Sequence, residues 1–169
     1  ANSDVGVYLG MERPDWALYL AGISISDLPE HAVSADTISV AAGRLSFVLG
    51  LNGPCMSIDT ACSSALVCTH NGVQALQAGE SDAAVSAASS ILLLPSGFVL
   101  RLNHNILSSD GRCKSFDAKA NGYVRAEGVG ACLLHIETEP TYDYGERGTI
   151  FKGTSVKQDG RSASLTAPN

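Results

Sequence analysis

The side chain with the clearest chemical potential is the thiol of Cys62, which stands where a strand-like segment passes into a helix-like one. Residues 57–59 alternate polar and β-branched side chains, whereas apolar residues recur at helical spacing after Ser63. A thiol at such a junction is expected to face the unpaired N–H groups of the first helical turn, which favour the thiolate. A thiolate can attack a thioester carbonyl, and the Cys62 N–H can help to bind the oxyanion that forms.

The neighbours of Cys62 favour this chemistry over a buried structural thiol, the usual state of a free cysteine. Residues 59–64, Asp-Thr-Ala-Cys-Ser-Ser, resemble the active-site motif of β-ketoacyl synthases. Upstream, residues 39–46 and 49–54 resemble the helix and turn before the nucleophile strand in ketosynthase domains of modular polyketide synthases. Downstream, the resemblance continues in residues 110–118, 122–128, 158–162 and 165–169. It therefore extends over nearly the whole chain.

The resemblance implies a reaction in two stages. Cys62 would accept an acyl chain from the phosphopantetheine arm of an acyl carrier protein. Two histidines would then decarboxylate a malonyl-type extender and stabilise its enolate for Claisen condensation. Those histidines belong to His-Gly-Thr-Gly-Thr and Asn-x-Gly-His motifs of the family's second half, and neither motif occurs in these 169 residues. The four histidines match no such motif and are expected to be structural or surface residues: His31, His70, His104 and His135.

Several functions compete within this resemblance. Residues 110–114 and 158–162 look more like polyketide synthases than like the main alternative, a ketosynthase of fatty-acid synthesis. A non-catalytic scaffold protein of this family usually lacks the cysteine that is present here as Cys62. A degradative thiolase lacks the Asp-Thr-Ala-Cys-Ser-Ser string. The resemblance also implies other synthase domains as partners, and a homodimer. The apolar run 91–94 is consistent with a homodimer, because it needs cover from solvent beyond what one subunit supplies.

Composition excludes other classes of protein. With 11 basic and 17 acidic residues the net charge is −6, and no basic stripe indicates nucleic acid. The five cysteines are an odd number without a C-x-x-C pair, which argues against a disulfide framework or a zinc site and favours a reducing compartment such as the cytoplasm. The apolar run 91–94 is far too short to span a membrane. No glycine spacing indicates a bound nucleotide, so no directly bound cofactor or metal is expected.

Strand and helix patterns alternate along the chain. Strands are expected at residues 5–10, 82–93 and 128–136, and helices at 16–20, 39–49 and from 65 to a glycine cap at Gly79. The stretch through Asp36 is expected to be irregular. The helix at 39–49 should turn one apolar face to the core, formed by Val40, Leu45, Val48 and Leu49, and the helix after Cys62 should be buried on most sides. Such alternation predicts a parallel or mixed α/β sheet covered on both faces.

The resemblance narrows this prediction to the thiolase-like fold, with α-β-α-β-α layers built from two similar halves. Residues 1–139 would be the first half and 140–148 the connection, while 149–169 would begin the second half with a strand at 149–153. The chain is therefore expected to be part of a longer synthase, and residues 1–169 made alone should neither fold well nor catalyse condensation.

Other polar residues have structural explanations. Arg125 and Glu127 are expected to form a buried pair under the site, and the Asp-Gly steps at 110–111 and 159–160 to form turns. Ser63 and Ser64 are expected to satisfy N–H groups at the helix start. The chain departs from the family pattern in having Ala-Ala-Ser-Ser at 87–90, Asn121 for an aspartate and Ala126 for a glycine.

Overall fold

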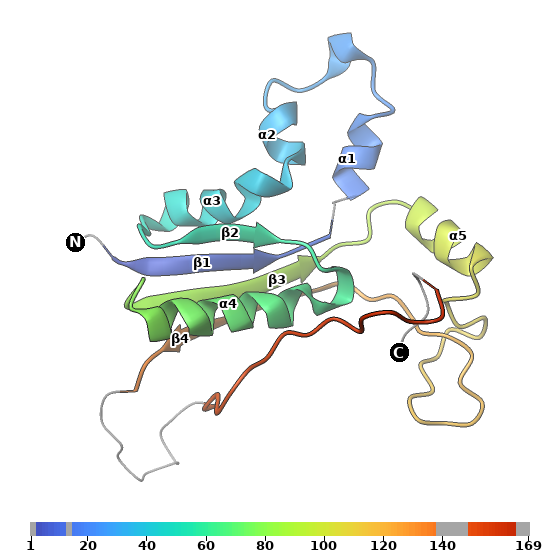
Figure 1. Cartoon of the computed structure of the whole chain (residues 1–169). Helices are drawn as coiled ribbons and strands as arrows, with labels where there is room; N and C mark the ends of the chain where they lie inside the picture. Colours follow the sequence, from blue (N-terminus) through green and yellow to red (C-terminus); the bar gives the residue numbers. More distant parts are fainter. Residues whose placement is uncertain (1–2, 13–14, 138–148, 165–169) are drawn as a thin grey trace.

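A mixed four-stranded sheet forms the centre of the computed structural model, which describes residues 3–12, 15–137 and 149–164 (Figure 1). The strand order is β2-β1-β3-β4. The strands are β1 (Val5–Gly10), β2 (Cys55–Ile58), β3 (Ala83–Ser90) and β4 (Gly128–His135). The first three are parallel, and β4 runs antiparallel to β3. The predicted mixed sheet is confirmed.

Two helices cover the sheet, one on each face (Figure 1). α3 (Ile38–Leu49) lies against β1 and β2, and α4 (Ser64–Ala78) lies against β1 and β3 on the other side. The remaining helical segments are α1 (Asp15–Leu20), η1 (Ile25–Asp27), α2 (Ala32–Asp36), η2 (Ala61–Ser63) and α5 (Ser96–Asn103). Two helix layers thus enclose the sheet, as predicted.

The core lies between α4 and the sheet. It consists of Tyr8, Cys68, Ala75, Leu76, Ala84 and Leu134. Gly72 lets the helix approach closely, since a Cβ there would lie 3.2 Å from Leu134 Cδ1 and 3.3 Å from Ala84 Cβ. α4 ends where predicted, at Gly79, whose φ of 70° lies in the left-handed region that favours glycine. Close packing of small residues therefore fixes this helix on the sheet.

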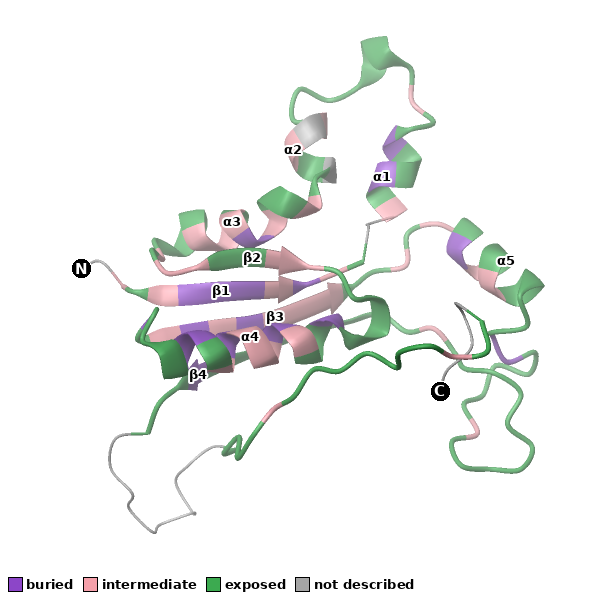
Figure 2. Cartoon of the chain, viewed as in Figure 1, coloured by how far each residue is buried: buried purple, intermediate pink, exposed green. Residues whose placement is uncertain are grey.

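The prediction that this helix is buried on most sides is wrong. One stripe of α4 is buried, formed by Ser64, Cys68, Gly72, Ala75 and Leu76 (Figure 2). Outside the stripe, Leu66 is 74% exposed. Sequence periodicity shows that apolar residues recur along a helix but not how many neighbouring layers cover them.

The predicted core face of α3 is wrong for three of its four residues, since Leu45 is half-buried but Val40 is exposed. Val48 and Leu49 are exposed, whereas Ala42 is buried. Ala42 N donates a hydrogen bond to Ser57 Oγ on β2 at 3.1 Å. A small residue brings the helix backbone within reach of the strand, and this contact determines which side of α3 faces inward.

Other boundaries differ from the predictions. The stretch through Asp36 contains η1 and α2, which polar composition concealed. β3 ends at Ser90, three residues earlier than predicted, and β4 buries Leu134 alone among its residues. The described residues contain no helix long and apolar enough to cross a membrane.

The strand predicted at 149–153 is absent, and the described residues 149–164 form neither helix nor strand. This segment runs in extended form beside α4 (Figure 1), where His70 Nδ1 and Thr154 Oγ1 lie 2.6 Å apart. A strand needs a hydrogen-bonded neighbour, and this segment has none in the described chain. The connection predicted at 140–148 lies outside the described residues, and the division into halves stays a prediction.

Candidate functional site

Cys62 lies on the short helical turn η2 between β2 and α4, which confirms the predicted strand-to-helix junction. Its side chain is exposed. The preceding residue, Ala61, has a φ of 56°, in the left-handed region that residues with a Cβ rarely occupy. The chain therefore turns sharply just before the thiol.

Hydroxyl groups tie this turn together. Ser64 Oγ accepts a hydrogen bond from Thr60 N at 2.8 Å and donates one to Ala61 O at 2.7 Å. Ser63 Oγ donates to Thr60 O and contacts Thr60 Oγ1, both at 2.8 Å. The predicted capping of helical N–H groups by these serines is wrong, because both hydroxyls bond back to the residues before the helix.

The backbone of the turn leaves one donor available. Ala61 N donates to Asp59 Oδ1 at 2.9 Å, Ser63 N to Thr60 O at 3.4 Å, and the Ser64 N–H to Ala61 O. Within the described chain, this pattern leaves the Cys62 N–H without a backbone acceptor. An N–H beside an exposed thiol can bind a developing oxyanion.

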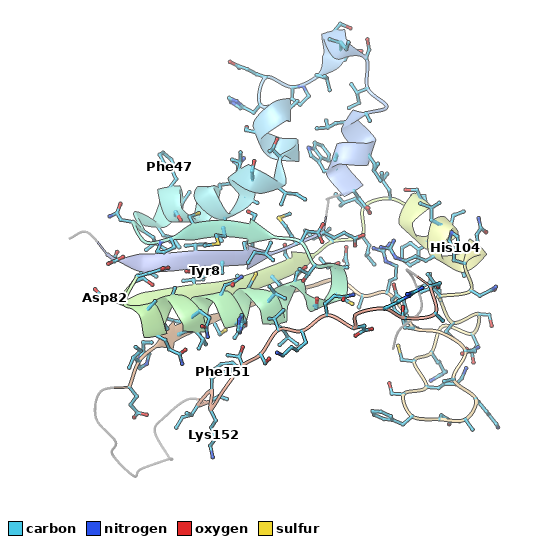
Figure 3. The ribbon with its side chains drawn as sticks, viewed as in Figure 1. Tyr8, Phe47, Asp82, His104, Phe151 and Lys152 are labelled. Atoms are coloured by element: carbon cyan, nitrogen blue, oxygen red, sulfur yellow. The ribbon has the colours of Figure 1, made fainter. Side chains whose placement is uncertain are left out.

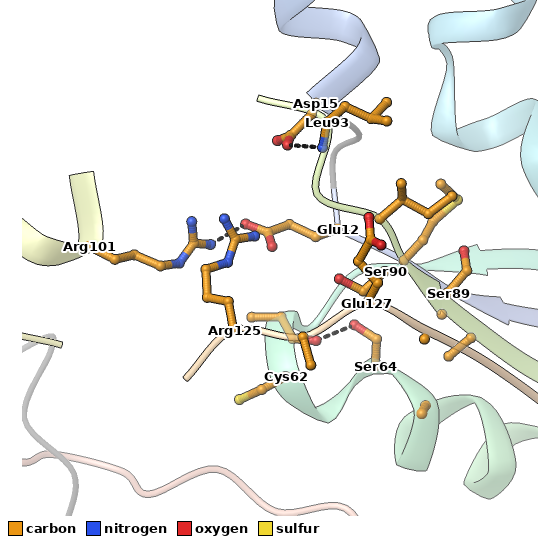
Figure 4. A pocket seen from close by; sticks show the side chains of 18 of the residues that line it. Glu12, Asp15, Cys62, Ser64, Ser89, Ser90, Leu93, Arg101, Arg125 and Glu127 are labelled. Carbon is orange, nitrogen blue, oxygen red and sulfur yellow. Dashed lines mark hydrogen bonds and ion pairs between the residues drawn. The ribbon is translucent and has the colours of Figure 1, made fainter. Parts of the chain in front are cut away.

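Cys62 borders a pocket of about 770 Å³ at the carboxyl ends of β1 and β3 (Figure 4). Strand ends and their following loops supply Gly10, Met11, Glu12, Ala88, Ser89 and Ser90. Arg101 comes from α5, and Arg125, Ala126 and Glu127 come from the segment before β4. A cleft at the carboxyl ends of parallel strands is a common place for ligands in α/β folds.

The acidic groups around the pocket already have partners in the described residues. Glu12 Oε1 pairs with Arg101 Nη2 at 2.9 Å, which joins the end of β1 to α5. Asp15 Oδ2 accepts hydrogen bonds from Leu93 N and Leu94 N, each at 3.0 Å. These contacts hold the walls of the pocket together.

The predicted pair between Arg125 and Glu127 is not formed. Glu127 Oε1 accepts a hydrogen bond from Leu92 N at 2.8 Å. The Arg125 guanidinium lies over the ring of Phe98, 5.1 Å from its centroid. The segment that leaves β3 has backbone N–H groups to satisfy, and that need draws Glu127 away from the arginine.

The alanines that replace the glycines of the family pattern do not lie in the left-handed region of φ and ψ. Ala87, Ala88 and Ala126 do not have positive φ, so alanine costs nothing there on that account. Asn121 Oδ1 accepts a hydrogen bond from Lys114 Nζ at 2.8 Å, and its Nδ2 donates to Asp110 Oδ1 at 3.2 Å. An aspartate in place of Asn121 could not make the second contact.

Asp110 is the centre of this loop network. It pairs with Lys114 at 2.7 Å, and the hydrogen bond from Lys114, with those from Ser108 and Asn121, holds the pKa of the Asp110 carboxyl well below its usual range. The Asp-Gly turn at 110–111 is confirmed, since Gly111 N donates to Ser108 O at 3.4 Å and Gly111 has a φ of 68°. At 159–160, Gly160 has the positive φ of 75° that glycine favours, but the chain forms no regular turn there. The network shapes the loop before the pocket and holds no group free for catalysis.

The other cysteines differ from Cys62 in place or burial. Cys68 is fully buried on α4, and burial raises the pKa of its thiol to about 11. Cys55, Cys113 and Cys132 are exposed but do not line the pocket. Cys62 is therefore the cysteine of the described chain that combines exposure with a place in the pocket.

The histidines lie elsewhere. His70 bonds with Thr154, and His31, His104 and His135 are exposed. No histidine lines the pocket in the part of the chain that the structure describes. In the same part, no cluster of histidine, cysteine or acidic residues could hold a metal ion.

Comparisons with known proteins agree with this geometry. Residues 1–139 match the family model of the β-ketoacyl synthase N-terminal domain. The chain is 38% identical over 169 residues to a phenolphthiocerol/phthiocerol polyketide synthase protein of Mycobacterium tuberculosis, covering 99% of this chain and 8% of that protein. It is 36% identical over 168 residues to the polyketide synthase component of compactin nonaketide synthase of Penicillium citrinum, covering 99% and 6%.

Solved structures give the same result. The ketosynthase from module 6 of the bacillaene synthase from Bacillus subtilis 168 matches with a TM-score of 0.80 and 35% identity, over 99% of this chain and 28% of that one. An oxazolomycin ketosynthase domain from Streptomyces albus matches with a TM-score of 0.68 and 30% identity, over 78% and 23%. The chain thus spans less than a third of the solved domains and under a tenth of the two synthases.

Proposed function

Since this chain belongs to the β-ketoacyl synthase family, we propose that it carries the acyl-accepting cysteine of a ketosynthase of polyketide biosynthesis. The observation that carries the proposal is the exposed thiol of Cys62 at the junction of β2 and α4, on the wall of a pocket. The predicted thiolase-like α/β fold is confirmed by the likeness to solved ketosynthases. The thiol stands at the end of a strand and the start of a helix within that fold.

In the first stage, the Cys62 thiolate attacks the carbonyl carbon of an acyl thioester carried on the phosphopantetheine arm of an acyl carrier protein. The carbonyl oxygen becomes an oxyanion, for which the Cys62 N–H is a suitable donor. Collapse of this intermediate expels the phosphopantetheine thiolate, which takes up a proton. The acyl chain is left on Cys62 as a thioester.

In the second stage, a malonyl-type extender loses carbon dioxide and its enolate attacks the acyl carbonyl on Cys62. The new carbon–carbon bond replaces the carbon–sulfur bond, and the thiolate is regenerated. Neither histidine motif of the family occurs in the sequence, and no described histidine lines the pocket. The chain therefore supplies the acyl acceptor, while decarboxylation depends on residues outside these 169.

The polyketide assignment is favoured over fatty-acid synthesis because the relatives described above are polyketide synthases. A scaffold protein without activity is disfavoured by the presence of Cys62 in an accessible position. We expect the acyl carrier protein and further synthase domains as partners. We also expect a cytoplasmic location, as the free cysteines favour.

A homodimer is part of the proposal. β2 is an edge strand that pairs with β1 alone in the described chain. Its Met56 is exposed, and so are Ile91 and Leu93 beyond the end of β3. Edge strands with exposed apolar neighbours need cover, and a second copy of the chain can supply it across a two-fold axis.

The decisive experiment measures which cysteine becomes acylated in the full-length protein. Acyl thioester and iodoacetamide should modify Cys62 well before Cys55, Cys113 or Cys132, and Cys68 should remain unmodified because it is buried. Equal modification of the exposed cysteines would refute the proposal.

Two substitutions at Cys62 separate the stages of the reaction. Cys62→Ala should abolish condensation while the protein stays folded, because a small exposed side chain leaves no cavity. Cys62→Gln should block acyl loading yet retain decarboxylation of a malonyl thioester. Condensation at the wild-type rate by either variant would show that the nucleophile lies elsewhere.

Sedimentation of the full-length protein tests the homodimer. A dimer is expected at micromolar concentration, and Met56→Lys should weaken it because two like charges would meet at the β2 edge. Leu102→Lys, an exposed position on α5, is the matched control and should leave the dimer intact. A monomeric wild-type protein would contradict this part of the proposal.

A further inference from the structure

The turn before Cys62 is held in a conformation that its sequence does not favour. Ala61 has a Cβ and yet adopts a φ of 56°, where contact between the Cβ and the backbone is unfavourable. Strained residues persist only where the surrounding structure over-determines them, and they occur often at functional sites. Something nearby must therefore hold Ala61 in place.

Asp59 Oδ1 accepts the Ala61 N–H at 2.9 Å, and Ser64 holds the carbonyl side of the same residue. Ser64 is 4% exposed, and its hydroxyl bridges Thr60 N at 2.8 Å and Ala61 O at 2.7 Å. Its backbone N–H also donates to Ala61 O. The buried Ser64 thus bonds to the backbone on both sides of Ala61. Its partners are the N–H of Thr60 before it and the carbonyl of the peptide bond between Ala61 and Cys62.

The end of β1 fixes Ser64 in turn. A Cβ on Gly10 would lie 2.9 Å from the Ser64 carbonyl carbon and 3.0 Å from both Ala65 N and Ser64 Cβ. The distance of 2.9 Å to a backbone atom is shorter than real Cβ contacts, so a larger residue at position 10 would force the start of α4 away from the sheet. The sheet therefore serves as the rigid support of the serine.

The neighbouring serine provides a contrast. Ser63 is exposed, and its hydroxyl contacts Thr60 alone. It makes no side-chain bond to Ala61 in the described structure. The two adjacent serines thus have different parts in the turn although their sequence context is nearly the same.

We propose that Ser64 is a positioning residue for the Cys62 thiol: its hydroxyl helps to hold Ala61 in the left-handed conformation that sets the position of Cys62 at the edge of the pocket. The inference rests on the proposed role of Cys62 as nucleophile. When the hydroxyl is removed, Ala61 relaxes towards ordinary φ values and the sulfur moves. A displacement of about 1 Å can lower a reaction rate about 100-fold.

The test is Ser64→Ala in the full-length protein, with the rate of acyl transfer to Cys62 as the readout. We expect a fall of about 10- to 100-fold, with the alkylation rate of exposed Cys113 unchanged and Cys68 still protected. Ser63→Ala is the matched control and should change the rate less than about threefold, since its hydroxyl makes no bond to Ala61.

A second substitution distinguishes positioning from a merely structural role. Glycine adopts a positive φ without the cost that alanine incurs. In the Ser64→Ala background, Ala61→Gly should therefore raise the acylation rate at least about fivefold, and it should have little effect on its own. A general loss of helix packing would not be repaired by a glycine at residue 61.

The outcomes are separable. Wild-type acylation in Ser64→Ala, absence of rescue by Ala61→Gly, or loss of Cys68 protection would each overturn the positioning role. If wild-type Cys62 is not acylated, the proposed function fails, and a crystal structure of Ser64→Ala then decides the inference. Ala61 should leave the left-handed region in that structure, and an unchanged turn would overturn it.

Discussion

Helices α3 and α4 cover opposite faces of one sheet and end alike, yet they are held in different ways. Each ends at a glycine in the left-handed conformation, Gly50 or Gly79. α4 buries a stripe of five residues, whereas α3 buries Ala42 alone. Figure 3 shows Phe47 on the outer side of α3, away from the sheet, while Tyr8 lies between the sheet and α4.

The difference reflects what each helix positions. α4 begins directly after the Cys62 turn, so any movement of this helix on the sheet moves the candidate nucleophile. α3 contacts β2, the strand that leads to the Cys62 turn, by the bond between Ala42 N and Ser57 Oγ. The tightly packed helix therefore supports the candidate nucleophile directly, and the loosely packed one presents an apolar surface formed by Phe47, Val48 and Leu49.

Truncation of an apolar side chain on each helix gives the largest expected contrast. Leu76→Ala removes a core side chain of α4 and should cost about 2–5 kcal/mol of unfolding free energy. Phe47→Ala on α3 should change it by less than about 0.5 kcal/mol, because the ring is 88% exposed. Denaturant unfolding of the full-length protein measures both. A large cost at Phe47 would show that another part of the protein covers α3.

Substitutions of the glycines inside the two helices should change the free energy of unfolding in opposite directions. Gly72→Val should destabilise the protein by about 1–3 kcal/mol, because its side chain would press on Leu134 and Ala84. Gly43→Ala should stabilise it by about 0.5–1 kcal/mol, because nothing lies within 4 Å of the added Cβ and alanine favours the helix. Thermal unfolding of both variants checks this pair, and changes of the same sign would remove the distinction between the helices.

The smallest expected effect concerns the hydroxyl of Tyr8, which is buried under α4 without a partner among the described residues. Burial, with a lesser contribution from Glu80, raises the pKa of Tyr8 above 10. The fold thus favours the neutral hydroxyl of Tyr8 over the phenolate. The free energy of unfolding that this preference contributes is fully present below about pH 10 and is lost as pH rises further.

Tyr8→Phe should therefore lessen the fall in stability between about pH 9 and pH 11, and should change stability by less than about 1 kcal/mol at pH 7. Unfolding curves at several pH values test this. Identical pH dependence in the variant and the wild type would show that the hydroxyl is not held in an apolar site.

Local patterns predicted much of the fold. β1 and the end of α4 at Gly79 fall at the predicted residues, and Cys62 lies at the predicted junction. These features depend on neighbours a few positions apart, where propensity and periodicity are informative. The identification of Cys62 as nucleophile is still a prediction, although its exposure and its pocket support it.

Features that depend on distant neighbours were predicted poorly. The inward face of α3 is decided by Ser57 on another strand, and Glu127 is drawn to Leu92 rather than to Arg125. Ser64 is buried where Gly10 at the end of β1 lies against it, whereas Ser63 beside it is exposed. Adjacent identical side chains carry no information about which of them will be buried.

By itself, the sequence determined the mixed α/β class, the strand β1, the end of α4 at Gly79 and the place of Cys62 between a strand and a helix, because each follows from local residue preference. Only the tertiary structure decided which serine bonds to Ala61 in the turn before Cys62, which face of each helix is buried, and which partners the charged side chains find. Those outcomes depend on close approaches between segments far apart in the chain, such as Gly10 with Ser64 and Gly72 with Leu134, where a few tenths of an ångström select one arrangement.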